Sequence, residues 1–141
     1  MPPDDERLTR LLRETRTIAM VGASIKHVRA SNRVGRYMAE QGYRIIPVNP
    51  GHAGKMLFGK PIVASLDDID GPVDMLNIFR RSDQIPPVVE HGLRALDGLK
   101  SVWMQLGLEN ADARAMAEEA GKEVVENRCL YIEHKRLFAL S

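Results

Sequence analysis

The strongest constraint on the fold is an alternation of short apolar runs and amphipathic segments along nearly the whole chain. The apolar runs have the length and composition of buried strands, and they lie at residues 17–21, 43–48, 73–79, 101–104 and 124–125. The other segments have helical periodicity or helix-cap residues, and they lie at residues 4–15, 33–41, 82–96, 110–121 and, in part, 129–141. Such alternation with short connections predicts an α/β fold: a Rossmann-like, doubly wound parallel sheet of five to six strands with helices on both faces.

Particular residues refine the boundaries of these elements. Ser82 is expected to be the N-cap of the helix that runs to Leu96, because a serine hydroxyl accepts hydrogen bonds from the free N–H groups of a first turn. Asn110 is expected to cap the following helix, and Ser65 to open a single helical turn. A further short strand is expected near residues 61–63.

The size of the chain, 141 residues of which 44% are hydrophobic, suits one core and is small for two independent domains. We expect one domain over residues 1–141, with an N-terminal helix over 1–15 and a C-terminal segment over 131–141. No apolar run approaches the roughly 18 residues that cross a bilayer. The acidic N-terminus lacks the features of an export signal, and the single cysteine, Cys129, leaves no internal disulfide or CxxC pair. A cytoplasmic protein with no membrane partner is therefore expected.

Charge is distributed unevenly along the chain. Residues 15–66 contain eight lysines and arginines and one acid, a net +7, so the remaining residues carry −6 of the overall +1. Segregation of this kind predicts an anion site in the first half. The near-neutral total and the aromatic content of 5% favour a local pocket for a phosphorylated small molecule over a broad nucleic-acid-binding face.

Ligands of an open parallel sheet bind at the carboxyl ends of its strands, beside the switch in strand order, so four loops are candidates. After the first strand, Gly22 allows close backbone approach and Ser24 offers a hydroxyl group. The next helix offers free N–H groups to a phosphate, and the nearby cations are Lys26, Arg29 and Arg33. The match to GxGxxG is poor, and a plain turn with surface cations is the alternative for this loop.

The second loop has Asn49-Pro50 where NAD-binding domains place an acid. Without an acid, and with Lys55 further along, this loop favours a nucleotide with an extra ribose phosphate over NAD and leaves NADP open. A simple turn is the alternative. In the third loop, adjacent Arg80 and Arg81 either grip a phosphate with their forked donors or are exposed and paired with an acid.

The fourth loop follows the apolar run at residues 101–104. Gln105 offers amide hydrogen bonds and Gly107 permits close backbone approach, whereas Trp103 is expected in the core. Cys129 is either a small buried residue or, as a hypothesis, a thiol that exchanges with a thiol ligand.

Seven motifs follow one another in the order Val-Gly-Ala-Ser (21–24), Asn-Arg-Val (32–34), Val-Asn-Pro (48–50), Gly-Lys-Pro (59–61), Phe-Arg-Arg (79–81), Trp-Met-Gln-Leu-Gly (103–107) and Asn-Arg-Cys-Leu (127–130). This order resembles the small, stand-alone CoA-binding proteins, whose fold is similar to the CoA-binding domain of the succinyl-CoA synthetase alpha subunit. The resemblance covers nearly the whole chain from Thr17 onward.

The resemblance implies a domain that holds coenzyme A by its nucleotide and phosphate end. The loops and the resemblance together indicate these cofactor-binding residues: Gly22, Ala23, Ser24, Lys26, Arg33, Asn49, Pro50, Lys55, Phe79, Arg80, Arg81, Gln105 and Gly107. The synthetase-type loop is richer in glycine than residues 22–33, and the synthetase's phosphohistidine domain has no counterpart here. Binding therefore carries over from the resemblance, and acyl-CoA synthesis does not.

The expected function is non-catalytic binding of coenzyme A or an acyl-CoA, as a carrier, sensor or regulator. No catalytic or metal-binding residue is assigned, because no nucleophile with a partner base and no HExxH spacing is evident. The expected partner is the CoA ligand, with no nucleic acid, and the chain is expected as a monomer or a homodimer. The alternative is an NADP-dependent oxidoreductase, for which 141 residues leave little room beyond the cofactor domain.

Overall fold

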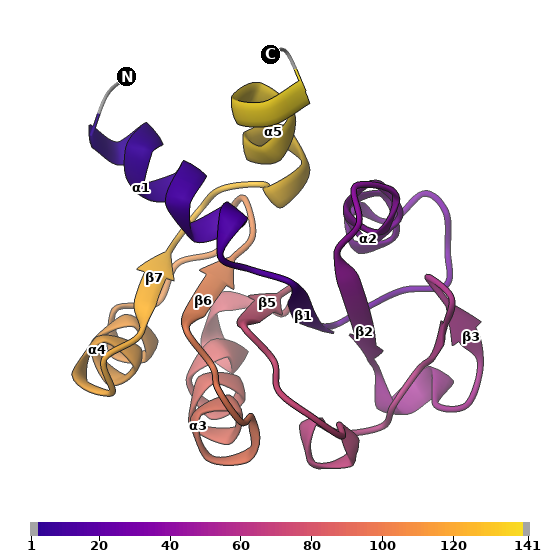
Figure 1. Ribbon diagram of the computed structural model, residues 1–141. Helices are drawn as coiled ribbons and strands as arrows, with labels where there is room; N and C mark the ends of the chain where they lie inside the picture. The colour runs from indigo at the N-terminus through magenta and orange to yellow at the C-terminus, as the bar shows by residue number, and fades with distance from the viewer. Residues whose placement is uncertain (1–2, 140–141) are drawn as a thin grey trace.

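A computed structural model describes residues 3–139, and its centre is a sheet of five parallel strands (Figure 1). Along the sheet the strands follow the order β2-β1-β5-β6-β7. Their bounds are β1 Thr17–Val21, β2 Arg44–Val48, β5 Met75–Ile78, β6 Ser101–Met104 and β7 Glu123–Val125. The chain moves outward from β1 to β2 and then returns to build the rest of the sheet on the other side of β1. The switch in strand order therefore lies between β1 and β5.

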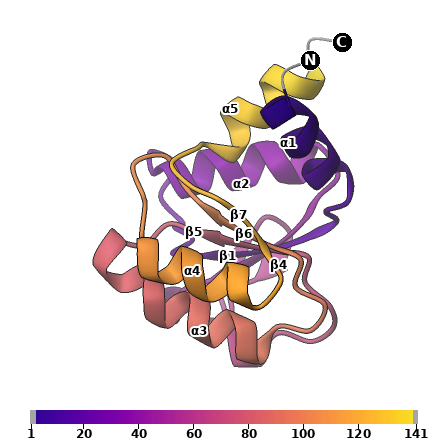
Figure 2. The same ribbon diagram turned by 90° about the vertical axis from the view of Figure 1, so that its left-hand side faces the viewer.

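Helices cover both faces of this sheet, with α1, α2 and α5 on one face and α3 and α4 on the other (Figure 2). Their bounds are α1 Pro3–Arg13, α2 Ala30–Glu40, α3 Ile85–Ala95, α4 Ala111–Glu119 and α5 Leu130–His134, which continues as a π-helical turn over Lys135–Ala139. The Rossmann-like, doubly wound α/β fold predicted from the sequence is confirmed. Within the described residues, no helix is both long and apolar enough to cross a membrane.

Each face of the sheet has its own apolar layer. Met20 and Trp103 are fully buried under α1, α2 and α5, while Leu76 and Val89 are fully buried on the side of α3 and α4. The indole Nε1 of Trp103 donates to the carbonyl oxygen of Arg128 at 2.8 Å, which satisfies the one polar atom of this buried side chain. The prediction that Trp103 belongs to the core is therefore confirmed.

Two predicted caps are confirmed and one is wrong. The side chains of Ser65 and Asn110 accept from the backbone N–H groups of the turns that they open, at 3.1 and 2.9 Å. Ser82 instead begins a 3₁₀ turn, Ser82–Gln84, and α3 starts three residues later with Gln84 as an N-cap that makes no side-chain cap bond. The second and third positions of α3 are Pro86 and Pro87, which have no N–H group for a cap to bind.

Two other predicted boundaries differ from the structure. Helix α2 begins at Ala30 rather than at Arg33, because its N-cap is Arg29, a residue type without a capping oxygen that would mark the start. The strand expected near residues 61–63 does not join the main sheet as a strand. Instead, β4 (Lys60–Pro61) pairs antiparallel with β3 (Met56–Leu57), and Val63 makes a single parallel bridge to the end of β2.

Candidate functional site

The loop after β1 is held by buried polar side chains at the start of α2. Ser31 and Asn32 are 4% and 1% exposed. The backbone N–H of Ser24 donates to Ser31 Oγ at 3.1 Å, and Asn32 Nδ2 donates to the Ser24 carbonyl oxygen at 2.8 Å. From the sequence, Ser31 was given no role and Asn32 was used only as part of the Asn-Arg-Val motif, although a Ser-Asn pair beside a helix start is a recognisable signal for such bonds. These contacts fix the loop at the carboxyl end of β1.

The N-terminus of α2 is open at this loop. Its N-cap residue, Arg29, is extended and makes no side-chain cap bond, so its side chain satisfies none of the first-turn N–H groups. The guanidinium of Arg33 folds back and donates to the carbonyl oxygen of Val28 at 3.0 Å. Lys26 is exposed on the same loop. The open helix end and the cations make this loop a favourable place for an anion.

Asn49 joins the loop after β2 to the loop after β1. Its Oδ1 accepts from the backbone N–H of Gly51 at 2.9 Å, and its Nδ2 donates to the carbonyl oxygen of Ala23 at 2.8 Å. Pro50 begins the 3₁₀ turn Pro50–His52 that follows. Asn49 thus shapes a turn, as the alternative interpretation held, and also ties together two loops of the candidate site.

The loop after β5 carries the two adjacent arginines. The backbone N–H of Phe79 donates to the carbonyl oxygen of Val21 at 2.9 Å, which extends the pairing of β5 with β1. Arg80 is exposed and forms no hydrogen bond or ion pair with any residue in the described part of the chain. Arg81 Nε lies 3.6 Å from an oxygen of Asp83, and both side chains are exposed, so Arg81 has the surface pairing that was its alternative.

Four of the predicted residues come together around one cavity of about 150 Å³ at the switch in strand order. They are Gly22, Asn49, Pro50 and Arg80. The rest of the cavity is mostly apolar, with walls that include Val21, Val48, Leu66 and Val88. An apolar cavity with a few convergent polar groups is the usual form of a small-molecule site.

Two polar residues of this cavity, Ser65 and His91, were not predicted. Ser65 follows the segment that pairs with the end of β2, and His91 comes from α3. His91 Nε2 lies 3.0 Å from Asp67 Oδ1, and the close approach of His91 lowers the pKa of Asp67 below its usual 3.8. The sequence marks Ser65 as a cap and gives no signal that it lines a cavity, and the place of His91 depends on long-range packing of α3, for which no local sequence signal exists.

The other predicted residues lie outside this cavity. Lys55 is exposed on the loop after β2. Gln105 is only 6% exposed, and its Oε1 has no hydrogen-bond partner within residues 3–139. The backbone N–H of Gly107 donates to Asn127 Oδ1 at 2.6 Å. Cys129 is the half-buried N-cap residue of α5 and packs against the apolar layer below that helix.

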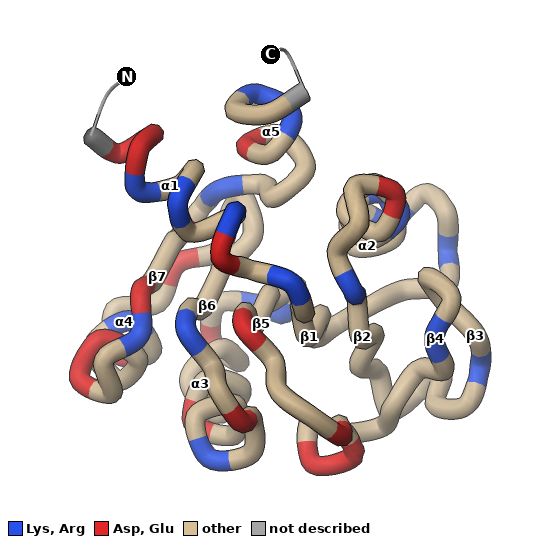
Figure 3. Tube along the Cα trace, viewed as in Figure 1, with Lys and Arg blue, Asp and Glu red and all other residues tan. Residues whose placement is uncertain are grey.

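Ion pairs are distributed unevenly along the chain. None of the eight cations in residues 15–66 forms an ion pair with another described residue, and the same holds for Arg80. The paired cations lie elsewhere and are Arg7, Arg10, Arg81, Lys100, Arg114, Arg128 and Arg136. Figure 3 shows lysines and arginines along α2, β2 and the β3–β4 hairpin, while acidic residues gather around β7 and α4. The first half therefore has positive charge available for a ligand.

The fold and this cavity define a Rossmann-like α/β domain with a candidate anion site at the switch in strand order. Residues 16–135 match the CoA binding domain family. The chain belongs to that family.

Proteins similar to this chain come from bacteria and archaea. The uncharacterised protein YneT of Bacillus subtilis is 38% identical over 132 residues, which cover 94% of this chain and 95% of YneT. A solved structure from Thermus thermophilus is 41% identical and superposes with a TM-score of 0.90 over 95% of this chain and 98% of its own. A hypothetical protein from Pyrococcus horikoshii is 35% identical, with a TM-score of 0.87 over 97% and 96% of the two chains.

Proposed function

We propose that the protein binds coenzyme A or an acyl-CoA by its nucleotide and phosphate end and serves as a carrier, sensor or regulator. The observation that carries this proposal is the unpaired guanidinium of Arg80, which lines the same cavity as Gly22 and Asn49 at the switch in strand order. A guanidinium with no carboxylate partner, placed beside the switch in strand order, favours an anionic ligand. Membership of the CoA binding domain family supports coenzyme A as that ligand.

The phosphates of the ligand are assigned to the loop after β1 and to the open N-terminal end of α2. Backbone N–H groups and the cations Lys26 and Arg33 would bind them there, with Arg80 approaching from the loop after β5. The mostly apolar cavity beside Gly22 suits the flat face of a nucleobase. Lys55, on the loop after β2, is the cation proposed for the ribose phosphate.

The proposed role is binding without chemistry. The cavity's polar side chains are an amide, a hydroxyl, a guanidinium and an imidazole, from Asn49, Ser65, Arg80 and His91. Asn49 is engaged with backbone groups and His91 lies against Asp67, so both are positioned for structural contacts. Binding and orientation of the ligand require nothing further from these groups.

The test is calorimetric titration of the full chain with CoA, dephospho-CoA, NADP and NAD in one buffer. We expect CoA to bind, and its affinity to fall by about tenfold or more when the ribose phosphate is removed, the scale of one charged hydrogen bond. Binding of NADP without binding of CoA would support the oxidoreductase alternative and would contradict this proposal.

A further inference from the structure

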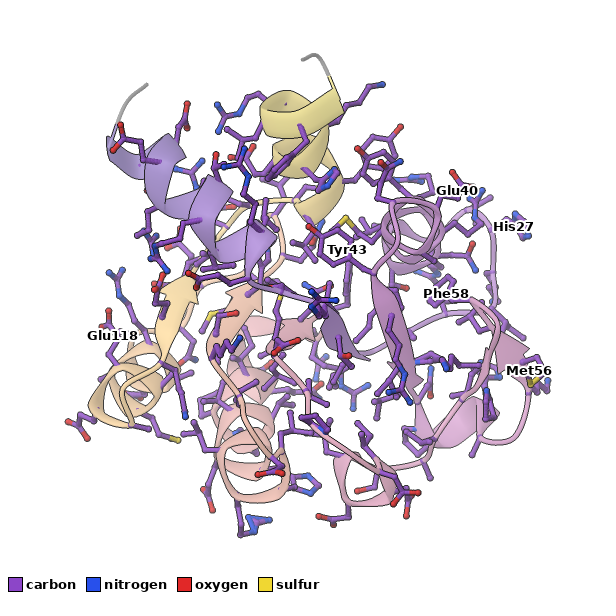
Figure 4. All side chains as sticks on the ribbon, in the orientation of Figure 1. His27, Glu40, Tyr43, Met56, Phe58 and Glu118 are labelled. Atoms are coloured by element: carbon purple, nitrogen blue, oxygen red, sulfur yellow. The ribbon has the colours of Figure 1, made fainter. Side chains whose placement is uncertain are left out.

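A groove of about 440 Å³ runs along α2, between this helix and the β3–β4 hairpin. One wall is the helix and the other is the hairpin. The side chains that matter here are Asn32, Arg36 and Glu40 from α2, and Met56, Leu57 and Phe58 from the hairpin. The three helical residues are spaced by four and so share one face of α2. Figure 4 shows Glu40 on α2 and Met56 and Phe58 on the hairpin, all at the right of the view.

The two walls differ in chemical character. On the helix wall, Arg36 Nε donates to Asn32 Oδ1 at 2.7 Å, and the carboxylate of Glu40 is exposed. On the hairpin wall, Met56 is 65% exposed although it is a large apolar residue. A polar wall that faces an apolar wall suits a flexible ligand arm with both amide and hydrocarbon groups. It suits a purely ionic ligand less well.

The hairpin wall is fixed in place by a contact between Phe58 and Gly35. A Cβ added at Gly35 would lie 2.2 Å from Cζ of the Phe58 ring, so the ring rests on the bare backbone of α2. Phe58 has a φ of 55°, a conformation that is unfavourable for a residue with a side chain. Because packing against Gly35 holds this conformation, the groove is a formed feature of the fold.

The groove also adjoins the loop proposed for the phosphates. Ile25 and His27, from that loop, line the groove, whereas Gly22, at the start of the same loop, lines the cavity described above. A ligand with phosphates at its centre would therefore have two places for its two arms. The cavity of about 150 Å³ is the smaller place, and the groove of about 440 Å³ is the larger.

We propose that this groove receives the pantetheine arm and the acyl group of a bound acyl-CoA, so that thioesters with an apolar acyl chain bind more tightly than free CoA. The inference rests on the proposed function and adds the substrate class. The amides of the arm meet Arg36 and Glu40, and the acyl chain covers the exposed Met56 and its neighbour Leu57. Covering apolar surface favours binding in proportion to the area removed from water.

The test is calorimetric titration of the full chain with CoA, acetyl-CoA, hexanoyl-CoA and octanoyl-CoA. Full burial of a methylene corresponds to roughly fourfold in affinity, and in an open groove we expect at least about tenfold between acetyl-CoA and octanoyl-CoA. Met56→Gln keeps size and charge but makes the wall polar, so most of that gain should disappear while affinity for free CoA stays within about twofold. Ile132→Gln, on α5, is the matched control, because Ile132 is also an exposed apolar residue, at 53%.

The possible results separate this inference from the proposed function. If CoA itself does not bind, the proposed function fails and the inference fails with it. If CoA binds and chain length has no effect, the inference alone is overturned. It is also overturned if Ile132→Gln removes the gain as fully as Met56→Gln does. If sedimentation shows a wild-type dimer that Met56→Gln dissociates, the groove is an interface between two copies, and the inference is overturned in that case too.

Discussion

Gly22 lies against the backbone of Phe79 so closely that an added Cβ would be 2.7 Å from the Phe79 carbonyl oxygen. Gly22 also has a φ of 90°, a conformation that residues with side chains rarely adopt. The contact brings the loop after β1 beside the end of β5, where the strand order switches. A glycine is therefore required at position 22 so that the loops after β1 and β5 can pack together. From the sequence, the reason for this glycine is a different one, the close approach of a ligand to the backbone.

Gly22→Ala should destabilise the fold by about 2–4 kcal/mol, because it adds the strain of a positive φ to a clash with backbone that has little freedom to move. Gly42→Ala is the matched control: Gly42 has a φ of 97°, and an added Cβ there would meet nothing within 4 Å. That variant should lose only about 1–2 kcal/mol. Urea denaturation measures both, and equal losses would show that the contact with Phe79 costs nothing.

Arg80→Ala should weaken binding of CoA by about 1.5–3 kcal/mol, the scale of a charged hydrogen bond, and leave the unfolding midpoint unchanged. The reason is that the Arg80 side chain is exposed and forms no hydrogen bond or ion pair with a described residue, so the fold loses no polar contact in this variant. Arg44→Ala is the control, since Arg44 is exposed, unpaired within the described residues, and placed at the opposite, amino end of β2. Similar losses of affinity in the two variants would mean that net charge matters and the cavity does not.

Arg33→Ala should weaken CoA binding on the same scale, about 1.5–3 kcal/mol. Arg33 also donates to the carbonyl oxygen of Val28, so its loss loosens the loop after β1 as well. Arg33→Lys keeps the charge and loses the forked donor, and titration with CoA should place its affinity between wild type and Arg33→Ala. Unchanged affinity in Arg33→Ala would remove α2 from the proposed phosphate site.

Asp74→Ala should lower stability by about 1.5–3 kcal/mol and leave CoA affinity unchanged. Oδ2 of Asp74 accepts from the backbone N–H groups of Arg16 and Thr17, both at 2.9 Å, at the amino end of β1 and far along the strand from the candidate site. Urea denaturation and CoA titration of the same preparation measure the two effects. A loss of affinity that matches the loss of stability would indicate that the site depends on the whole fold.

Local signals were sufficient for most of the fold. The apolar run at 17–21 is β1, the run at 101–104 is β6, and the caps at Ser65 and Asn110 are where the sequence places them. These elements have residues whose own chemistry marks their ends or their burial. Because parallel strands separated by helices allow few arrangements, the fold class follows from these elements.

The features that the sequence did not reveal depend on contacts between distant residues. The β3–β4 hairpin depends on the fit of Phe58 against Gly35, which lies much earlier in the chain, on α2. His91 reaches the cavity only because α3 packs beside the turn that contains Asp67. Residue types and spacing predict which loops meet at the edge of the sheet, and long-range packing determines which further side chains join them.

His134 connects α5 to α2 in the layer above the sheet. It is 6% exposed, its Nδ1 lies 2.8 Å from the hydroxyl oxygen of Tyr37, and its ring stacks on Phe138 with the centroids 4.7 Å apart. Burial lowers the pKa of His134 below its ordinary value of 6.5. The folded protein therefore favours the neutral imidazole.

Stability should consequently decrease as pH falls below about 6.5, because the unfolded chain then binds a proton that folded His134 resists; the slope for one such group is at most about 1.4 kcal/mol per pH unit. This contribution is fully present above the unfolded pKa and is lost as pH falls toward the lower, folded one. Asp5 and Asp67 have pKa values below 3.8, lowered by a hydrogen bond from Arg136 and by the close approach of His91 respectively, so their titration lies outside this range. His134→Phe keeps the stacked ring and cannot be protonated. Urea denaturation between about pH 5 and pH 7.5 should therefore show a smaller slope for this variant than for wild type, and equal slopes would exclude His134 as the source.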